Sequence, residues 1–193
     1  MAEDSLAVRP APPAAYQKEN AAKEGAWHLE TMLRLVPSTH RQRSMTSRAP
    51  PDDSFVVLVV EDEQDHAALI QAAFAYREMP CALHVTGSSE EAIDYLLGRW
   101  PFDNRLRHPL PSVIILDLGL PGLGGLDFLR WLGTRREPWS MTPVVVFTAN
   151  TNRALATQAF ALGAKEVKIK PTDFTELVDI VEEVLRRWRS HIA

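Results

Sequence analysis

The chain has 193 residues, 46% of them hydrophobic, with a formal net charge of −4 at pH 7 and a single cysteine, Cys81. This composition favours one globular domain of ordinary size with extra sequence beside it, and it excludes an intrachain disulfide. The sequence has no strongly basic region of the kind that binds nucleic acid, and its apolar runs are too short to span a bilayer. We therefore expect a cytoplasmic protein without direct nucleic-acid or membrane contact.

Residues 1–53 form an N-terminal extension whose composition differs from that of the remaining chain. Proline recurs in "RPAPP" (9–13), at Pro37 and in "APP" (49–51). A helix is predicted near residues 14–36, because apolar residues from Leu29 to Val36 follow helical spacing and Pro37 ends the pattern. Two interpretations stay open: a largely flexible tail with a transient helix, or a helix that docks on the domain or on a partner.

From residue 54 onward, short apolar segments alternate with helical segments. The expected strands are "FVVLVV" (55–60), "CALHVT" (81–86), "SVIIL" (112–116), "PVVVF" (143–147) and "KEVKI" (165–169). The expected helices lie near residues 65–77, 89–98, 125–136, 152–162 and 173–189. The alternation implies right-handed crossovers between parallel strands. Residues 54–193 are therefore predicted to form a doubly wound α/β domain with a five-stranded parallel sheet and helices on both faces.

The last expected helix has an apolar surface wider than a single stripe facing a sheet requires. Asp173, with Glu176 three residues later, fits a capping box at its start. Its apolar residues are Phe174, Leu177, Val178, Ile180, Val181, Val184, Leu185 and Trp188. Because this width suggests a second buried face, we expect a homodimer formed through this helix.

Groups suited to phosphate or metal chemistry follow four of the five expected strands. Glu61 and Asp62 follow the first strand, Asp117 the third, Thr148 the fourth and Lys170 the fifth. Open α/β sheets bind their ligands at the carboxyl ends of the strands. We therefore expect these five side chains to meet in one site.

The chemistry of this set points to phosphoryl transfer. Three acidic groups in one site repel each other, and a hard cation such as Mg²⁺ relieves that repulsion through oxygen ligands. Lys170 would supply positive charge to Asp117 or to a phosphate oxygen, and Thr148 would supply a hydroxyl donor. Because phosphoryl transfer needs little beyond positioning and charge neutralisation, a carboxylate nucleophile at Asp117 would form an aspartyl phosphate.

Four blocks of the sequence together resemble the receiver domain of two-component response regulators. They are "LVVEDEQD" (58–65), "IILDLGLPGLGGLDFL" (114–129), "VVFTAN" (145–150) and "GAKEVKIKP" (163–171). The resemblance implies a flavodoxin-like sheet with strand order 2-1-3-4-5. It also implies that Asp117 accepts a phosphoryl group from a histidine of a sensor kinase. The same resemblance assigns the Mg²⁺ ion to Glu61, Asp62, Asp117 and the backbone carbonyl of Gly119.

Further expectations follow from the same resemblance. Thr148 matches the switch hydroxyl of the family and Lys170 its lysine, with a cis peptide bond expected between Lys170 and Pro171. The long segment at 96–121 looks like that of the single-domain regulators that partner bacterial phytochrome histidine kinases. In those regulators dimers form through the last helix or its neighbours. Because only "SHIA" follows the last expected helix, we expect output through protein contact, and no enzyme activity beyond the regulator's own phosphorylation and dephosphorylation.

The sequence departs from the family pattern at several positions. Glu61 replaces the commoner Asp, and its longer side chain is expected to reach the metal ion through water. Val167 stands where Tyr or Phe often rotates inward, so the signal is expected to depend on Thr148 and the loop after it. Gly124-Gly125 replaces Asp-Gly, which is expected to change only the turn.

Other interpretations of the site stay open. One is a receiver-like interaction module that is not phosphorylated. Another is a phosphohydrolase of the haloacid dehalogenase type, although that family carries D-x-D after its first strand. The six histidines show no metal-ligand spacing, and His66 is expected at the exposed start of a helix, with proximity to Asp62 left open.

Overall fold

The computed structural model describes residues 55–76 and 81–190. Within them the elements run in the order β1 (Val56–Val60), α3 (Gln64–Tyr76), β2 (Ala82–Thr86), α4 (Ser89–Leu97), β3 (Val113–Leu116), α5 (Gly125–Gly133), the short 3-10 helix η2 (Pro138–Met141), β4 (Val144–Thr148), α6 (Arg153–Ala161), β5 (Glu166–Ile169) and α7 (Phe174–Arg189). All of the predicted strands and the helices between them are present, whereas η2 was not predicted. The N-terminal extension 1–53, with its predicted helix at 14–36, lies outside the described residues.

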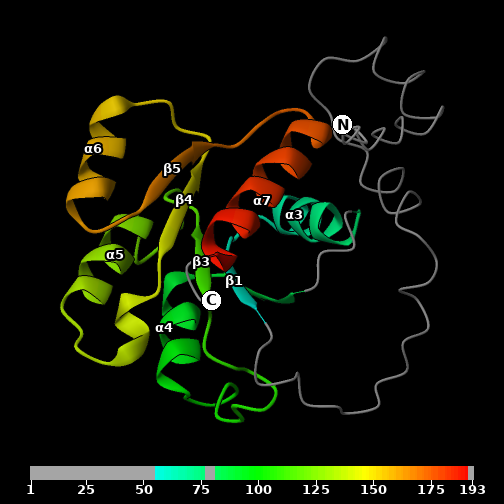
Figure 1. Ribbon diagram of the computed structural model, residues 1–193. Helices are drawn as coiled ribbons and strands as arrows, with labels where there is room; N and C mark the ends of the chain where they lie inside the picture. Colours follow the sequence, from blue (N-terminus) through cyan, green and yellow to red (C-terminus); the bar gives the residue numbers. More distant parts are fainter. Residues whose placement is uncertain (1–54, 77–80, 191–193) are drawn as a thin grey trace, which may run out of the picture.

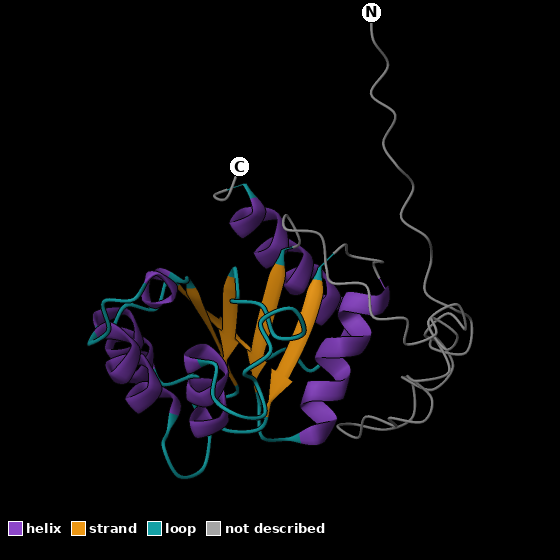
Figure 2. Cartoon of the chain, turned by 90° about the horizontal axis from the view of Figure 1, so that it is seen from below, coloured by secondary structure: helices purple, strands orange, loops and turns teal. Residues whose placement is uncertain are grey.

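The five strands form one parallel sheet in the order β2-β1-β3-β4-β5, which confirms the expected fold. Figure 1 shows α3 and α7 on one face of the sheet and α4, α5 and α6 on the other, and Figure 2 shows the same layers from below. Alternate residues along each strand face opposite layers. In β1, Val57 and Val59 pack in the core under α3 and α7, whereas Leu58 and Val60 pack in the core under α4 and α5. The central strands are buried on both sides, as their apolar sequences predicted.

Helix α7 uses its wide apolar surface within the chain. Asp173 caps the helix, its side chain accepting hydrogen bonds from the backbone N–H groups of Thr175 (2.8 Å) and Glu176 (3.1 Å). The apolar residues of α7 pack against α3 and the sheet, and the outermost pair, Ile180 and Trp188, is partly buried in the same core. The width of this face is therefore explained by packing between two elements of one chain, and it no longer supports the predicted homodimer.

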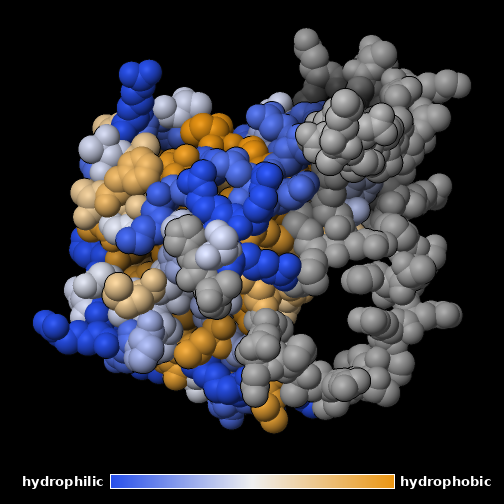
Figure 3. All heavy atoms as spheres, in the orientation of Figure 1, coloured by the Kyte–Doolittle hydropathy of each residue, from blue (hydrophilic) through white to orange (hydrophobic). Residues whose placement is uncertain are grey.

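The outer face of α7 and the neighbouring strand β5 carry ion pairs. Lys168 Nζ lies 3.0 Å from Glu183 Oε2, and Arg187 lies 3.3 Å from Glu183 Oε1 and 3.4 Å from the buried Glu166. Figure 3 shows mainly hydrophilic residues over this part of the molecule. The exposed side of α7 is thus polar.

Residues 98–111, which we call the α4–β3 segment, form a loop at the amino ends of the strands (green, at the bottom of Figure 1). Arg105 donates hydrogen bonds to the carbonyl oxygens of Tyr95 (2.8 Å), Leu96 (2.7 Å) and His108 (3.2 Å). Because the first two carbonyls belong to the last turn of α4, the guanidinium caps that helix end and its charge matches the negative end of the helix dipole. This segment therefore has a defined structure, held by hydrogen bonds from a side chain to backbone carbonyls.

Aromatic side chains fill the space beneath the α4–β3 segment. Tyr95, which is 1% exposed, donates its hydroxyl proton to the carbonyl of Pro109 at 2.7 Å. Its ring packs against those of Phe102 (centroids 5.2 Å apart), His84 (5.4 Å) and His108 (5.9 Å). The amino end of the sheet is thus closed by rings that pack in tilted and edge-to-face arrangements.

Two further observations concern the backbone and the surface. Among the described residues the cis peptide bond joins Trp100 and Pro101, so the expectation of a cis bond at Lys170–Pro171 was wrong; X–Pro peptides differ little in energy between the two forms. None of the described helices is long and apolar enough to cross a membrane.

Candidate functional site

Hydrogen bonds between neighbouring strands continue to the residues that carry the predicted site. The N–H of Glu61 donates to the carbonyl of Thr86 (3.0 Å), and the N–H of Asp117 donates to that of Val60 (3.0 Å). The N–H of Lys170 donates to the carbonyl of Thr148 at 2.8 Å. The backbone of each of these residues is thus held by the adjacent strand, although each lies just beyond the end of its own. Side chains placed in this way start from rigid positions.

Three carboxylates gather at the carboxyl end of the sheet. Glu61, Asp62 and Asp117 each offer an oxygen, and these oxygens all lie within 4.8 Å of one another. Glu61 is 3% exposed and Asp117 9% exposed, whereas Asp62 is open to solvent. This donor set consists only of carboxylate oxygens, the ligand type that Mg²⁺ prefers, so the residues present fit the expected ion.

Lys170 lies between two of these carboxylates. Its Nζ is 2.6 Å from Glu61 Oε2 and 2.7 Å from Asp117 Oδ2, and its side chain is 11% exposed. Burial raises the pKa of Glu61, and its contacts with Lys170 offset only part of that effect. Burial on its own would lower the pKa of Lys170, but its hydrogen bonds to both carboxylates outweigh this and raise it. The ammonium group therefore compensates charges that would be costly if buried alone.

The second oxygen of Asp117 is held by the turn that follows β3. Asp117 Oδ1 accepts a hydrogen bond from the N–H of Gly119 at 3.0 Å. Gly125 packs beneath this turn, where an added Cβ would lie 2.4 Å from the Asp117 carbonyl oxygen and 2.8 Å from Leu118 Cα. Only glycine fits at this point, so the turn and the start of α5 hold Asp117 in place. The role of the Gly119 carbonyl as a metal ligand stays a prediction.

Thr148 is the last residue of β4 and is 4% exposed. Its Oγ1 accepts a hydrogen bond from the N–H of Asn150 at 3.1 Å, so its own proton is available to another acceptor. Val167, which stands where the family often has an aromatic residue, is partly buried in the core under α4 and α5. Thr148 thus lies on the expected edge of the sheet, in the strand next to Asp117.

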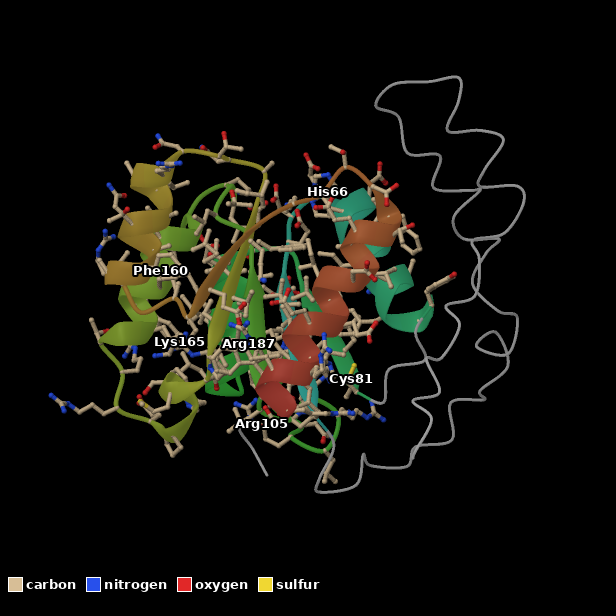
Figure 4. All side chains as sticks on the ribbon, turned by 45° about the horizontal axis from the view of Figure 1, so that its top comes forward. His66, Cys81, Arg105, Phe160, Lys165 and Arg187 are labelled. Carbon is tan, nitrogen blue, oxygen red and sulfur yellow. The ribbon has the colours of Figure 1, made fainter. Side chains whose placement is uncertain are left out.

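His66 also belongs to this site, although the sequence analysis placed it at the exposed start of a helix. Its Nδ1 lies 3.3 Å from Lys170 Nζ, 3.7 Å from Glu61 Oε1 and 2.8 Å from Glu63 Oε2. It occupies the first turn of α3, and its side chain is 38% exposed (labelled in Figure 4). The sequence did indicate this position. His66 lies in the first turn of the helix that follows the acidic end of β1, and that turn starts beside the site.

Comparison with known proteins finds relatives that are regulatory proteins. The sequence model of the family described as the response regulator receiver domain matches residues 57–182. The probable methanogenesis regulatory protein FilR2 of Methanothrix harundinacea is 32% identical over 141 residues, which cover 71% of this chain and 85% of FilR2. The DNA-binding transcriptional regulator NtrC of Escherichia coli K12 is 27% identical over 134 residues, covering 69% of this chain but only 25% of NtrC. The methanogenesis regulatory protein FilR1 is likewise matched over only 31% of its length.

Solved structures agree in fold. The phosphorylated cyanobacterial phytochrome response regulator RcpA is similar with a TM-score of 0.63 and 27% identity, covering 72% of this chain and 96% of RcpA. The response regulator RPA3017, from red light signaling of R. palustris, has a TM-score of 0.65 and 25% identity, covering 69% and 93% of the two chains. The bacteriophytochrome response regulator AtBRR has a TM-score of 0.56 and 26% identity, covering 68% and 92%.

Proposed function

Because this chain belongs to the response regulator receiver family, we propose that it accepts a phosphoryl group on Asp117 from a histidine of a sensor kinase, with Mg²⁺ as the metal ion. The observation that carries the proposal is the environment of Asp117. Its carboxylate lies at the end of a buried strand, with one oxygen against Lys170 and the other against the N–H of Gly119. Glu61 and Asp62 stand beside it.

The proposed reaction transfers a phosphoryl group between two nucleophiles. A carboxylate oxygen of Asp117 attacks phosphorus, the bond from phosphorus to the kinase histidine nitrogen breaks, and that nitrogen leaves with the bonding electrons. Lys170 and the Thr148 hydroxyl would each hold an oxygen of the transferred group. Mg²⁺, held by Glu61, Asp62, Asp117 and the Gly119 carbonyl, would supply further charge neutralisation when bound.

The kinase partner is proposed to be a bacterial phytochrome histidine kinase. The support is the similarity of this chain to RcpA, RPA3017 and AtBRR, whose names or descriptions refer to phytochromes or to red light. Receiver domains are signalling modules, so the proposed product is a changed surface for a partner protein in the cytoplasm. Because Val167 stands where the family often has Tyr or Phe, the change of surface is proposed to depend on Thr148 and the loop that follows it.

A homodimer through α7 and neighbouring elements is part of the same proposal. The support lies on α6 and β5, two elements in contact with each other, where Phe160 of α6 is 51% exposed and Ile169 of β5 is 46% exposed. Large exposed apolar side chains on adjoining elements are candidates for burial in an interface. Light scattering before and after addition of beryllofluoride with Mg²⁺ tests this, and an unchanged monomer mass in both states would contradict it.

Phosphotransfer from candidate kinases tests the central claim. Radiolabelled phosphate should move to the wild-type chain and not to Asp117→Asn, which keeps the shape of the side chain but removes the nucleophile. Intact-mass spectrometry after treatment with acetyl phosphate and Mg²⁺ should show the same difference. Labelling that persists in Asp117→Asn would place the nucleophile elsewhere.

A further inference from the structure

The ammonium group of Lys170 has three N–H donors, and the structure offers it three acceptors. Two are the carboxylate oxygens of Glu61 and Asp117, at 2.6 Å and 2.7 Å. The third is Nδ1 of His66, at 3.3 Å. Lysine is a point charge on a flexible stem, so its position depends on the number of groups that hold the charge. His66 supplies the only contact among these three that comes from a helix.

Two groups compete for the same nitrogen of His66. Nδ1 also lies 2.8 Å from Glu63 Oε2, and one nitrogen cannot accept a hydrogen bond from Lys170 and donate one to Glu63 in the same tautomer. Glu63 is 62% exposed, so water can solvate its carboxylate. Lys170 is 11% exposed, and an unmet N–H of a buried ammonium is costly. The hydrogen bond from the buried Lys170 ammonium to the Nδ1 lone pair is therefore favoured over the contact with Glu63.

From this geometry we propose that His66 is a positioning residue for Lys170. The imidazole, with its proton on Nε2, accepts the third hydrogen bond of the ammonium through Nδ1 and keeps the ammonium next to Asp117. Without it, the lysine would be held by two carboxylates only, with the shorter contact to Glu61. This inference rests on the proposed function, because it concerns the lysine that would meet the transferred phosphoryl group.

Three substitutions at position 66 separate an acceptor from a space filler. His66→Ala removes the acceptor, His66→Asn places an amide oxygen near the position of Nδ1, and His66→Gln places one near that of Nε2. The half-exposed position on the first turn of α3 tolerates all three without loss of fold. In the full chain, phosphorylation by acetyl phosphate with Mg²⁺ should slow about 3- to 10-fold in His66→Ala and His66→Gln, the size of one ordinary hydrogen bond. His66→Asn should stay close to wild type.

A second readout follows the lysine directly. The ¹⁵N-edited NMR signal of the Lys170 ammonium should be visible in wild type and His66→Asn, and broadened by faster proton exchange in His66→Ala. Glu63→Gln is the matched control, because it removes the competing carboxylate and should leave both the rate and the signal unchanged or improved.

The outcomes distinguish this inference from the function on which it rests. Equal rates and equal lysine signals in wild type and His66→Ala overturn the positioning role, as does a His66→Asn variant as slow as His66→Ala. If Glu63→Gln reproduces the defect of His66→Ala, the pair with Glu63 matters instead and the inference is wrong. If wild type takes no phosphate at all, the proposed function fails, while the lysine signal still reports whether His66 holds Lys170.

Discussion

The two ends of the sheet are closed by opposite kinds of chemistry. At the carboxyl end, buried charges lie against each other, with Lys170 between Glu61 and Asp117. At the amino end, the α4–β3 segment is held by packed aromatic rings around Tyr95 and by the guanidinium of Arg105 against helix carbonyls. Burying ion pairs adds little net stability, whereas burying rings adds much. We infer that the carboxyl end carries the function and that the amino end carries a larger share of the stability.

The largest expected effect on stability comes from removing Tyr95, and it tests whether the amino end carries stability without carrying function. Tyr95→Ala removes a ring that is 1% exposed and contacts three other rings. We expect the free energy of unfolding to fall by about 3–5 kcal/mol, the usual range for deleting a buried aromatic side chain. Urea unfolding measures this.

Tyr95→Phe is the matched control for that experiment. It removes only the hydroxyl that donates to Pro109, so the expected loss is about 1 kcal/mol. The rate of Asp117 phosphorylation in the folded fraction should be the same in both variants as in wild type. A slowed rate in the stable Tyr95→Phe variant would show that the two ends are coupled.

Gly125 is the place where the site itself depends on packing. A Cβ there would lie 2.4 Å from the Asp117 carbonyl oxygen, so Gly125→Ala must displace the turn beneath Asp117. We expect a loss of about 1–3 kcal/mol, as for other overpacked positions, together with slower phosphorylation. Gly124→Ala is the control, because the nearest atom to its added Cβ is 4.0 Å away. Equal behaviour of the two variants, in urea unfolding and in acetyl phosphate assays, would contradict this account.

The cap on α4 should give a smaller effect confined to the amino end. Arg105→Gln removes the guanidinium that donates to Tyr95, Leu96 and His108. We expect the free energy of unfolding to fall by about 1–2 kcal/mol, because water can donate hydrogen bonds to some of these carbonyls instead. Arg107→Gln, at an exposed residue of the same segment, should change stability by less than about 0.5 kcal/mol. If both variants unfold at the same urea concentration, the cap has no role in stability.

Much of the fold was predictable from the sequence because parallel strands and helices leave different apolar periods. The strand positions were predicted to within one residue. The predicted helix at 125–136 ends earlier, at Gly133, and the 3-10 helix after it was missed because four residues give no periodic signal. The breadth of the apolar face of α7 was predicted correctly, and its cause lies within the chain, because a sequence does not show that one helix packs against both a sheet and another helix. The homodimer inferred from that breadth stays a prediction.

The candidate site was predictable in part for a related reason. Strand order and register bring Glu61, Asp117 and Lys170 to one edge, so their proximity follows from their places at strand ends. The contact between His66 and Lys170 did not follow in the same way. It depends on the rotation of α3 about its own axis, which is set by packing against α7 and the sheet.

The smallest expected effect is a dependence of stability on pH that arises at the amino end. Burial, and the nearby His108, lower the pKa of His84 below its usual value of 6.5. Arg105, which donates a hydrogen bond to the His108 carbonyl, adds positive charge beside this pair and does not favour a protonated ring. The unfolded chain therefore binds a proton at a higher pH than the folded chain does, so stability is complete above the usual pKa and falls as the pH drops below it.

Between about pH 7.5 and about pH 5.5, across the usual histidine range, the urea midpoint of wild type should fall further than that of His84→Gln, which has no proton to gain. Because the carboxylates at the other end of the sheet are the same in both proteins, the difference isolates the amino end, and identical pH profiles would show that His84 is not held neutral by the rings around it.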